Sequence, residues 1–342
     1  MRNRIRRLLH VAVALVLHYT GALTLLAFLR WRLIGRPIIY VLAFHRVLAR
    51  GEENVSNSLP GMIISESTFV ALLGYLNRKF QFVSLDRILA NGVEARNAGA
   101  PLCLVTFDDA WSDTYRRAAP ALQSLKIPAV VFVPTSAIGS HTGFWVEEFT
   151  GAYKREDTVK RISAKTGQAK NSVRPCNNPE DTVEFLKHMP AEKRDEILAN
   201  LLHAGDGKGS AGVDAMMTWD QVTEVSAHGF EIGSHTATHP LLTFEDDATQ
   251  AWELESSREL LRDRLATNIR AFAYPNGDWN SKVRESVIRA GYSCAFTTKA
   301  GCYAYGSDLY SVPRFLLHEG NVTGFRGQFS RAMTNLTLAG WA

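Results

Sequence analysis

Two adjacent carboxylates and a pair of histidines are the side chains of this 342-residue chain best suited to chemistry. Asp108 and Asp109 directly follow a short apolar run, and His235 and His239 lie four residues apart in the segment SHTATHP. Two imidazoles and one carboxylate can hold a divalent ion such as Zn²⁺ and leave positions open for water and substrate. The second carboxylate would then be free to act as a general base.

Each pair has a plainer explanation when it is taken alone. Adjacent carboxylates after a strand often cap a helix or a turn. Histidines four apart also occur by chance on exposed helices, and this pair lacks the adjacent Glu of zinc-protease helices. The metal prediction therefore depends on the combination of both pairs at neighbouring strand ends.

The elements that would position these side chains are short apolar runs alternating with helical patterns. The expected strands are Ile38–His45, Phe80–Leu85, Leu102–Phe107, Ala129–Pro134, Phe230–Gly233, Ala271–Tyr274, Ser293–Thr297 and Leu309–Leu317. The expected helices are Glu66–Lys79, Ala118–Leu125, Trp219–Ala227, Ala248–Ala266 and Lys282–Ala290. Apolar strands with helices between them indicate a parallel α/β sheet or barrel, and seven or eight such units favour a barrel.

In parallel barrels the active site gathers at the carboxyl ends of the strands, and here polar residues follow five of the expected strands. Beyond the two pairs, the residues at these ends are His45, Pro275, Asn276, Arg314 and His318.

Residues 135–217 interrupt the alternation of strands and helices, since they are long, polar and mostly helical in pattern. We interpret them as a segment inserted over one end of the barrel. Such a segment can be a lid or a substrate platform, or only a solvated excursion. Trp145 is the residue of the insertion that we expect to contact substrate.

The N-terminus predicts a membrane anchor over residues 1–36. Leu8 to Leu29 are 22 residues without a charged side chain, and a helix of that length covers roughly 33 Å at about 1.5 Å per residue, enough for one pass through a bilayer. A helix on the membrane surface or a buried helix is the alternative. Four arginines precede the span and three follow it, which weakly favours a cytoplasmic N-terminus at the cytoplasmic membrane and a body on the extracytoplasmic side.

Charge and cysteine content exclude several other classes of protein. The net charge is +4, and residues 37–342 carry 31 basic and 34 acidic side chains, unlike a nucleic-acid-binding surface. The four cysteines are scattered, with no Cys-x-x-Cys pair, so neither a zinc ribbon nor a disulfide scaffold is expected.

Four segments carry a resemblance to the polysaccharide deacetylases, the NodB-homology group or carbohydrate esterase family four. LVTFDDA (residues 104–110) resembles the first motif, TFDDG, with Ala110 in place of Gly, and SHTATHP (234–240) resembles the second, His-[Ser/Thr]-x-x-His-Pro. FAYPNG (272–277) is similar to the third, Arg-x-Pro-Tyr-Gly, and AFHRV (43–47) to the Tyr-His-x-Val run of bacterial members. The likeness covers about Ile38 to His318, except for most of the insertion.

The resemblance implies a deacetylase domain over residues 37–342, with 135–217 inserted, folded as a distorted TIM-like (β/α) barrel of about seven strands. It implies that Asp108 is the base and that Asp109, His235 and His239 bind the metal. The ion would most readily be Zn²⁺, with Co²⁺, Ni²⁺ or Mn²⁺ as alternatives. The loop with Pro275 and Asn276 would supply a backbone N–H to the oxyanion. His45 would either face the substrate side of the site or merely close the first strand.

The chain departs from the family pattern at the third motif, where Ala273 and Asn276 stand for Arg and Tyr. We expect Arg314, in SVPRF, to polarise the base instead. FLLH (315–318) loosely matches the late motif that ends in the histidine acid, so His318 is either that acid or a plain surface histidine.

The predicted function is N-deacetylation of a polysaccharide or lipid-linked oligosaccharide that contains N-acetylhexosamine. Two alternatives remain: a catalytically lapsed carbohydrate-binding or assembly protein of the same fold, and a polysaccharide O-deacetylase. The expected partners are an N-acetylated glycan and the membrane.

Overall fold

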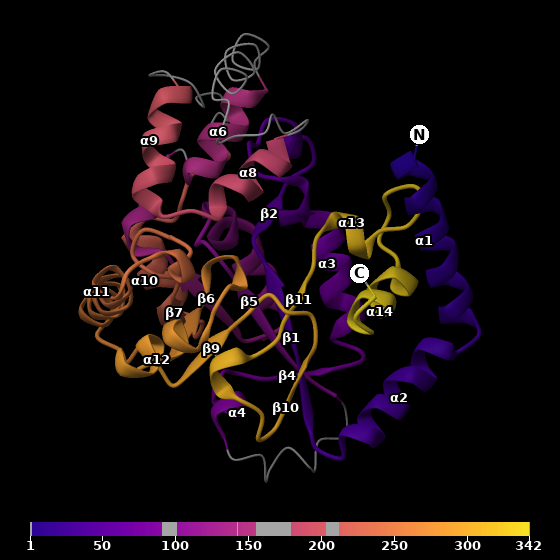
Figure 1. Ribbon diagram of the computed structural model, residues 1–342. Helices are drawn as coiled ribbons and strands as arrows, with labels where there is room; N and C mark the ends of the chain where they lie inside the picture. The colour runs from indigo at the N-terminus through magenta and orange to yellow at the C-terminus, as the bar shows by residue number, and fades with distance from the viewer. Residues whose placement is uncertain (1, 91–100, 142, 155–178, 203–211, 342) are drawn as a thin grey trace.

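A computed structural model describes residues 2–90, 101–141, 143–154, 179–202 and 212–341 (Figure 1). Its main sheet contains β1 (Ile38–Phe44), β4 (Gln81–Phe82), β5 (Leu102–Phe107), β6 (Ala129–Val133), β7 (Glu231–Ser234), β8 (Ala271–Ala273), β9 (Cys294–Phe296), β10 (Cys302–Ala304) and β11 (Phe315–Leu316). A separate parallel pair is formed by β2 (Arg46–Leu48) and β3 (Ile63–Ser65).

The strands of the main sheet curl into a distorted barrel. Neighbours β1, β5, β6, β7, β8 and β9 all pair in parallel. The other edge of β1 pairs with β10 in antiparallel fashion at its start and with β11 in parallel at its end. An isolated parallel bridge joins Phe296 of β9 to Val312, so the segment that leads into β11 brings the two edges of the curled sheet together. The predicted α/β barrel of about seven strands is confirmed.

Alternating residues of each strand face two apolar layers, which explains why the strands are apolar throughout. In β1, Ile39 and Val41 join the layer inside the barrel, whereas Tyr40, Leu42 and Phe44 pack against the surrounding helices. Both layers are buried, as expected for a parallel sheet with helices outside it.

The outer helices are α3 (Glu66–Leu76), α4 (Asp86–Leu89), α5 (Ala119–Ser124), α10 (Trp219–Ala227), α11 (Asp247–Leu265), α12 (Ser281–Arg289), α13 (Glu319–Val322) and α14 (Arg331–Leu338). Several begin at a polar residue whose side chain accepts a hydrogen bond from the first helical turn: Ser65, Thr218, Asp246, Asn280 and Ser330.

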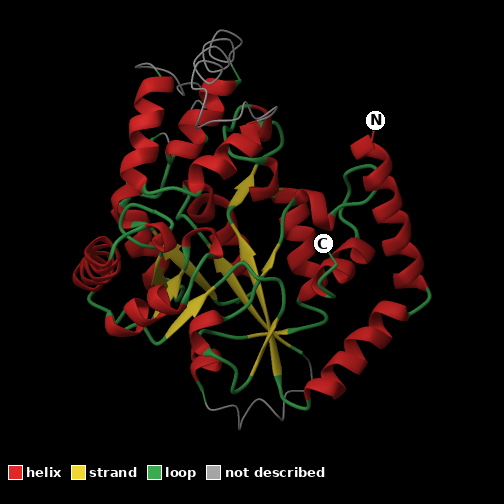
Figure 2. Cartoon of the chain, viewed as in Figure 1, coloured by secondary structure: helices red, strands yellow, loops and turns green. Residues whose placement is uncertain are grey.

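The insertion contributes a further layer beyond the carboxyl ends of the strands. It holds α6 (Trp145–Tyr153), α8 (Pro179–Lys187) and α9 (Ala191–Leu201), which lie together above β2 and β6 in Figure 2. These helices share their own apolar cluster, centred on Phe149, Val183, Leu186 and Leu198. Residues 142, 155–178 and 203–211 of the insertion lie outside the described residues.

The prediction of one unbroken N-terminal helix is wrong. The segment forms α1 (Arg2–Tyr19) and α2 (Ala22–Ile34), which meet at an angle of 73°. The break lies at Thr20 and Gly21, where Gly21 adopts the left-handed conformation that ends many helices. Neither helix alone is long and apolar enough to cross a bilayer, although the bent pair taken together has the length and composition.

The last expected strand is also shorter than predicted. Leu309–Ser311 is a short 3₁₀ helix, and Pro313, which has no backbone N–H to donate to a sheet, separates it from β11. The strand expected at Phe80–Leu85 is reduced to β4. The sequence analysis did not predict β2, β3 or β10.

Candidate active site

The carboxyl ends of β5 and β7 bring Asp109, His235 and His239 to one point. Asp109 Oδ1 lies 3.6 Å from His235 Nε2 and 3.5 Å from His239 Nε2, and the two imidazole nitrogens are 3.2 Å apart. These three residues form a cluster that could hold a metal ion. Asp109 and His235 are buried, and His239 is partly exposed, which leaves an open side.

The spacing of the three atoms fits a small divalent cation. Ligands about 2.05 Å from a tetrahedral Zn²⁺ stand roughly 3.3 Å apart, close to the separations found here. Asp109 Oδ1 is buried and has no hydrogen-bond partner among the described residues, as expected for an atom whose partner is a metal. His235 Nδ1 donates to the carbonyl of Ala273 at 2.7 Å, so its Nε2 carries the free lone pair.

The electrostatics of the three residues without an ion also suit metal binding. Burial, reinforced by the charge of Asp108, raises the pKa of Asp109 to about 8. Burial lowers the pKa of both His235 and His239, so both imidazoles are neutral at physiological pH. A cation would replace a proton on Asp109 and bind two neutral imidazoles.

The loops that carry these residues are held in uncommon backbone conformations. Asp109, Ala110, Thr236, His239 and Asn276 all have positive φ angles, between 56° and 74°. Such a concentration is typical of a functional site that the surrounding structure holds in place. At Ala110 the family motif has Gly, the residue that adopts this conformation without a steric penalty.

A carboxylate from α11 fixes the loop between the two histidines. Glu253 accepts hydrogen bonds from the backbone N–H groups of Ala237 and Thr238 at 2.7 and 2.9 Å and binds the Thr238 hydroxyl. The sequence analysis missed this residue, because a Glu inside a helix gives no sign of a distant loop partner.

Asp108 forms a buried, bidentate ion pair with Arg314. Arg314 Nη1 and Nη2 each lie 2.7 Å from one carboxylate oxygen, and Nε donates to the carbonyl of Thr297. Burial alone would raise the pKa of Asp108, but the Arg314 guanidinium outweighs it and holds the pKa well below its usual range. Arg314, in the segment before β11, therefore gives Asp108 the guanidinium partner that is missing from the third motif.

His45 and His318 lie in different surroundings. His45 Nε2 is 3.8 Å from Asp108 Oδ2, and its Nδ1 has no hydrogen-bond partner among the described residues. Burial lowers the pKa of His45 to about 4 in the absence of an ion. His318 instead caps α13 through a hydrogen bond from the Gly320 N–H. The structure thus places His45 beside Asp108, whereas His318 caps a helix.

Lys187, the last residue of α8, reaches from the insertion to the third-motif loop. Its Nζ donates to Asn276 Oδ1 at 3.1 Å, and its charge helps to lower the pKa of His239 and His45. Pro275, the first residue of this loop, is buried. The sequence analysis missed Lys187, since it lies among other charged residues in an amphipathic pattern.

In the described part of the insertion, Phe144 rather than Trp145 contacts the group formed by Asp109, His235 and His239. The Phe144 ring lies 4.7 Å from that of His239. Trp145 contacts the Arg194 guanidinium at 5.1 Å and packs in the apolar cluster of the insertion. Its expected contact with substrate stays a prediction, without support from its position.

We expect Arg314→Lys to lower turnover about 10–100-fold, since one of two charge-assisted hydrogen bonds worth about 1.5–3 kcal/mol is lost. Arg314→Met should in addition raise the pKa of Asp108 and move the rising limb of the pH–rate profile to higher pH. Steady-state rates across pH measure both effects. Arg284→Lys is the matched control, because Arg284 makes a similar two-pronged pair with Asp308 at the surface. Unchanged rates in both Arg314 variants would mean that Arg314 has only a structural role.

Comparison with known sequences identifies the family. The sequence model described as polysaccharide deacetylase matches residues 95–174 and 187–295, more than half of the chain. The chain belongs to the polysaccharide deacetylase family. This confirms the family predicted from the motifs, and deacetylases of this family depend on a metal ion.

The chain matches its curated relatives over only part of their length. The Bacillus subtilis (strain 168) protein YxkH, named as a polysaccharide deacetylase, is 25% identical over 152 residues, 44% of this chain and 53% of YxkH. The poly-beta-1,6-N-acetyl-D-glucosamine N-deacetylase of Escherichia coli (strain K12) is 26% identical over 270 residues, 70% of this chain and 31% of that protein.

Solved deacetylases share the fold. The Streptococcus pyogenes deacetylase PplD, solved in complex with acetate, has a TM-score of 0.55 and 19% identity, with 84% of this chain and 95% of PplD covered. IcaB from Ammonifex degensii has a TM-score of 0.55 and 20% identity, with 90% of this chain and 98% of IcaB covered.

Proposed function

We propose that the chain is a metal-dependent N-deacetylase of a glycan that contains N-acetylhexosamine. The observation that supports this proposal is that two features lie side by side. Asp109, His235 and His239 can hold a metal ion, and the adjacent Asp108 is kept ionised by Arg314. The choice of an N-acetylated glycan is supported by the Escherichia coli relative, which is named for poly-beta-1,6-N-acetyl-D-glucosamine.

A divalent ion, for which Zn²⁺ is our first choice, would acidify a water molecule and polarise the acetyl carbonyl when held by Asp109, His235 and His239. Asp108 would accept the proton of the attacking water, and its guanidinium partner keeps it ionised for that purpose. The backbone N–H of Asn276 would donate to the developing oxyanion. His45, which lies beside Asp108, would pass the proton that Asp108 accepts from the water on to the departing amine, and it is better placed for this than His318.

Acetate release separates this proposal from its two alternatives. Purified protein loaded with Zn²⁺ is incubated with N-acetylglucosamine oligomers and, separately, with an O-acetylated glycan. We expect acetate from the first substrate, and none after removal of the metal by a chelator. Release only from the O-acetylated glycan would indicate an O-deacetylase. No release from either, with retained glycan binding, would indicate a lapsed enzyme; the contact between Arg314 and Asp108 argues against that outcome.

We further propose that α1 and α2 attach the chain to a membrane, with the catalytic domain on the extracytoplasmic side of the cytoplasmic membrane. Both helices expose large apolar side chains: Ile5, Leu8, Leu9, Val13, Val16, Tyr19, Leu25, Leu26, Phe28, Leu29 and Leu33. Residues 1–36 also carry seven arginines and no acidic residue, which suits anionic lipid headgroups.

Full-length protein should therefore remain with membranes after an alkaline wash. The double variant Leu25→Glu and Phe28→Glu should shift most of it to the soluble fraction, because two charges would oppose burial in lipid. Phe325→Glu is the control, an equally exposed aromatic residue outside the two helices. Wild-type protein that washes off completely would contradict membrane attachment, and a reporter fused after Ala342 would identify the side of the membrane.

A further inference from the structure

Trp111, two residues after Asp109, donates a hydrogen bond to the carboxylate of that residue. The indole Nε1 lies 3.1 Å from Asp109 Oδ2, and the side chain is fully buried. The two carboxylate oxygens of Asp109 thus have different neighbours: Oδ2 accepts from Trp111, whereas Oδ1 faces the imidazoles of His235 and His239.

The indole ring is itself held from several sides. The Arg46 guanidinium lies over it at 4.0 Å, and the ring of Phe144 meets it edge-on at 5.7 Å. Gly143 makes room for the ring, since a Cβ at that position would stand 2.6 Å from Trp111. The ring therefore has little freedom to turn its N–H away from Asp109.

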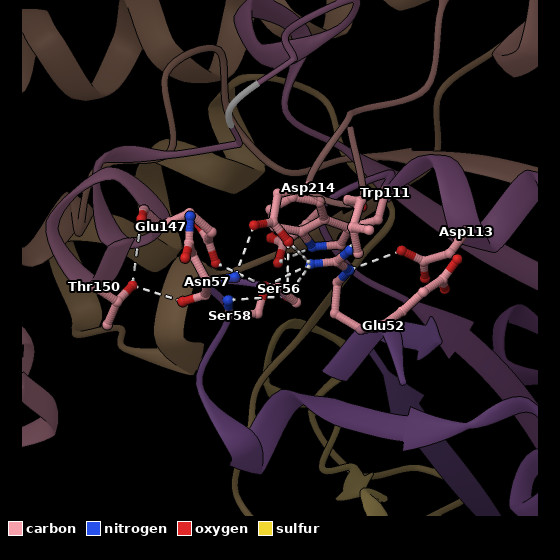
Figure 3. A network of polar contacts seen from close by, with 12 residues as sticks. Glu52, Ser56, Asn57, Ser58, Trp111, Asp113, Glu147, Thr150 and Asp214 are labelled. Atoms are coloured by element: carbon pink, nitrogen blue, oxygen red, sulfur yellow. Dashed lines mark hydrogen bonds and ion pairs between the residues drawn. The ribbon is translucent and has the colours of Figure 1, made fainter. Parts of the chain in front are cut away.

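Arg46 cannot easily move either, because its side chain is fully buried and all three guanidinium nitrogens donate hydrogen bonds. Figure 3 labels three of its partners, Ser58, Asp113 and Asp214. Its Nε donates to Asp113 at 2.8 Å, Nη1 to Asp214 at 2.9 Å and to Ser58 at 2.6 Å, and Nη2 to the carbonyl of Val213 at 2.7 Å. A buried cation with two carboxylate partners and planar geometry is a rigid support for the ring stacked on it.

We propose that Trp111, supported by Arg46, is a positioning residue for the metal ion: its N–H fixes Oδ2 of Asp109 so that Oδ1 faces the ion. This inference rests on the metal dependence of the proposed function. Residues that hydrogen-bond to metal ligands and orient them typically contribute about 10–100-fold to metal affinity. A neutral N–H donor also leaves the negative charge of the carboxylate available to the cation.

The test measures Zn²⁺ binding directly, by calorimetry on full-length metal-free protein. Trp111→Phe keeps an aromatic ring beneath Arg46 but removes the N–H, so we expect the Kd to rise about 10–100-fold. Activity should return at saturating Zn²⁺, and the unfolding temperature of the metal-free protein should stay close to that of the wild type. A Co²⁺-substituted sample should show an altered visible absorption spectrum, which reports ligand geometry.

Trp219→Phe is the matched control, because Trp219 also lies beneath an arginine, Arg264, at 5.3 Å. Its Zn²⁺ affinity should equal that of the wild type. If Trp111→Phe does not fold, the benzothienyl isostere of tryptophan at position 111 removes only the N–H and allows the same measurement. Wild-type Zn²⁺ affinity and an unchanged Co²⁺ spectrum in either of the two proteins altered at position 111 would overturn the positioning role alone. Failure of the wild-type protein to bind Zn²⁺ would overturn the metal-dependent function as well.

Discussion

Asp108→Asn should keep the metal site intact and lose most of the turnover. The amide is nearly the same size as the carboxylate but cannot accept a proton from water, and a positioned general base contributes about 10²–10⁴-fold. We therefore expect a fall in kcat of about that size, measured as acetate release under saturating Zn²⁺. Because Asp108 is outside the three-residue cluster, the Kd for Zn²⁺ should change far less than kcat.

Asp308→Asn is the matched control for this variant. Asp308 accepts a two-pronged ion pair from Arg284 at the surface, so its replacement removes a comparable pair without touching the base. It should leave kcat unchanged. Full activity in Asp108→Asn would rule out Asp108 as the base, and loss of the metal together with turnover would mean that the two aspartates have the opposite roles.

Asp109→Asn and His235→Ala should lose the metal first and the activity as a consequence. His235→Ala removes one of the three ligand atoms, and Asp109→Asn replaces the only carboxylate among them with a neutral amide. We expect Zn²⁺ affinity to fall by more than the roughly 10–100-fold typical of residues that only orient metal ligands. Excess Zn²⁺ should partly restore Asp109→Asn but not Asp108→Asn. Full metal occupancy in His235→Ala would show that the ligand assignment is wrong.

The affinity for Zn²⁺ should also depend on pH, because Asp109 must lose a proton to bind the ion. Burial raises its pKa to about 8, so below that pH the metal-free site holds a proton that the cation must displace. Zn²⁺ affinity should rise as the pH increases towards 8, and binding at pH 7 should release about one proton. Calorimetry in buffers of different ionisation enthalpy counts that proton. Asp109→Asn, which has no proton to lose, should release none from this position.

Much of the candidate site was predictable because the chemistry lies in short segments at strand ends. Asp108, Asp109, His235 and His239 are each adjacent to an apolar run, and parallel strands bring such ends together. The barrel followed from the same alternation of strands and helices. The roles of these residues stay predictions until the variants are measured.

The features that were missed depend on contacts between segments far apart in the sequence. Arg46, Asp113 and Asp214 read as ordinary surface charges, yet they form one buried network. Lys187 lies 89 residues from Asn276. The break at Gly21 was overlooked because apolar composition continues on both sides of it, and composition says nothing about backbone conformation.

The network around Arg46 also fastens both ends of the inserted segment at one place. Ser58, which Arg46 binds, donates to Glu147 near the start of the insertion, and Asp214 near its end binds Arg46 itself. A segment that leaves and returns at a shared anchor can change in length at small entropic cost, since closure entropy varies only with the logarithm of length. We therefore expect changes of length between Glu147 and Asp214 to leave Asp108, Asp109, His235 and His239 in place. Because Lys187 of this stretch contacts Asn276, such changes would act on the substrate side of the site.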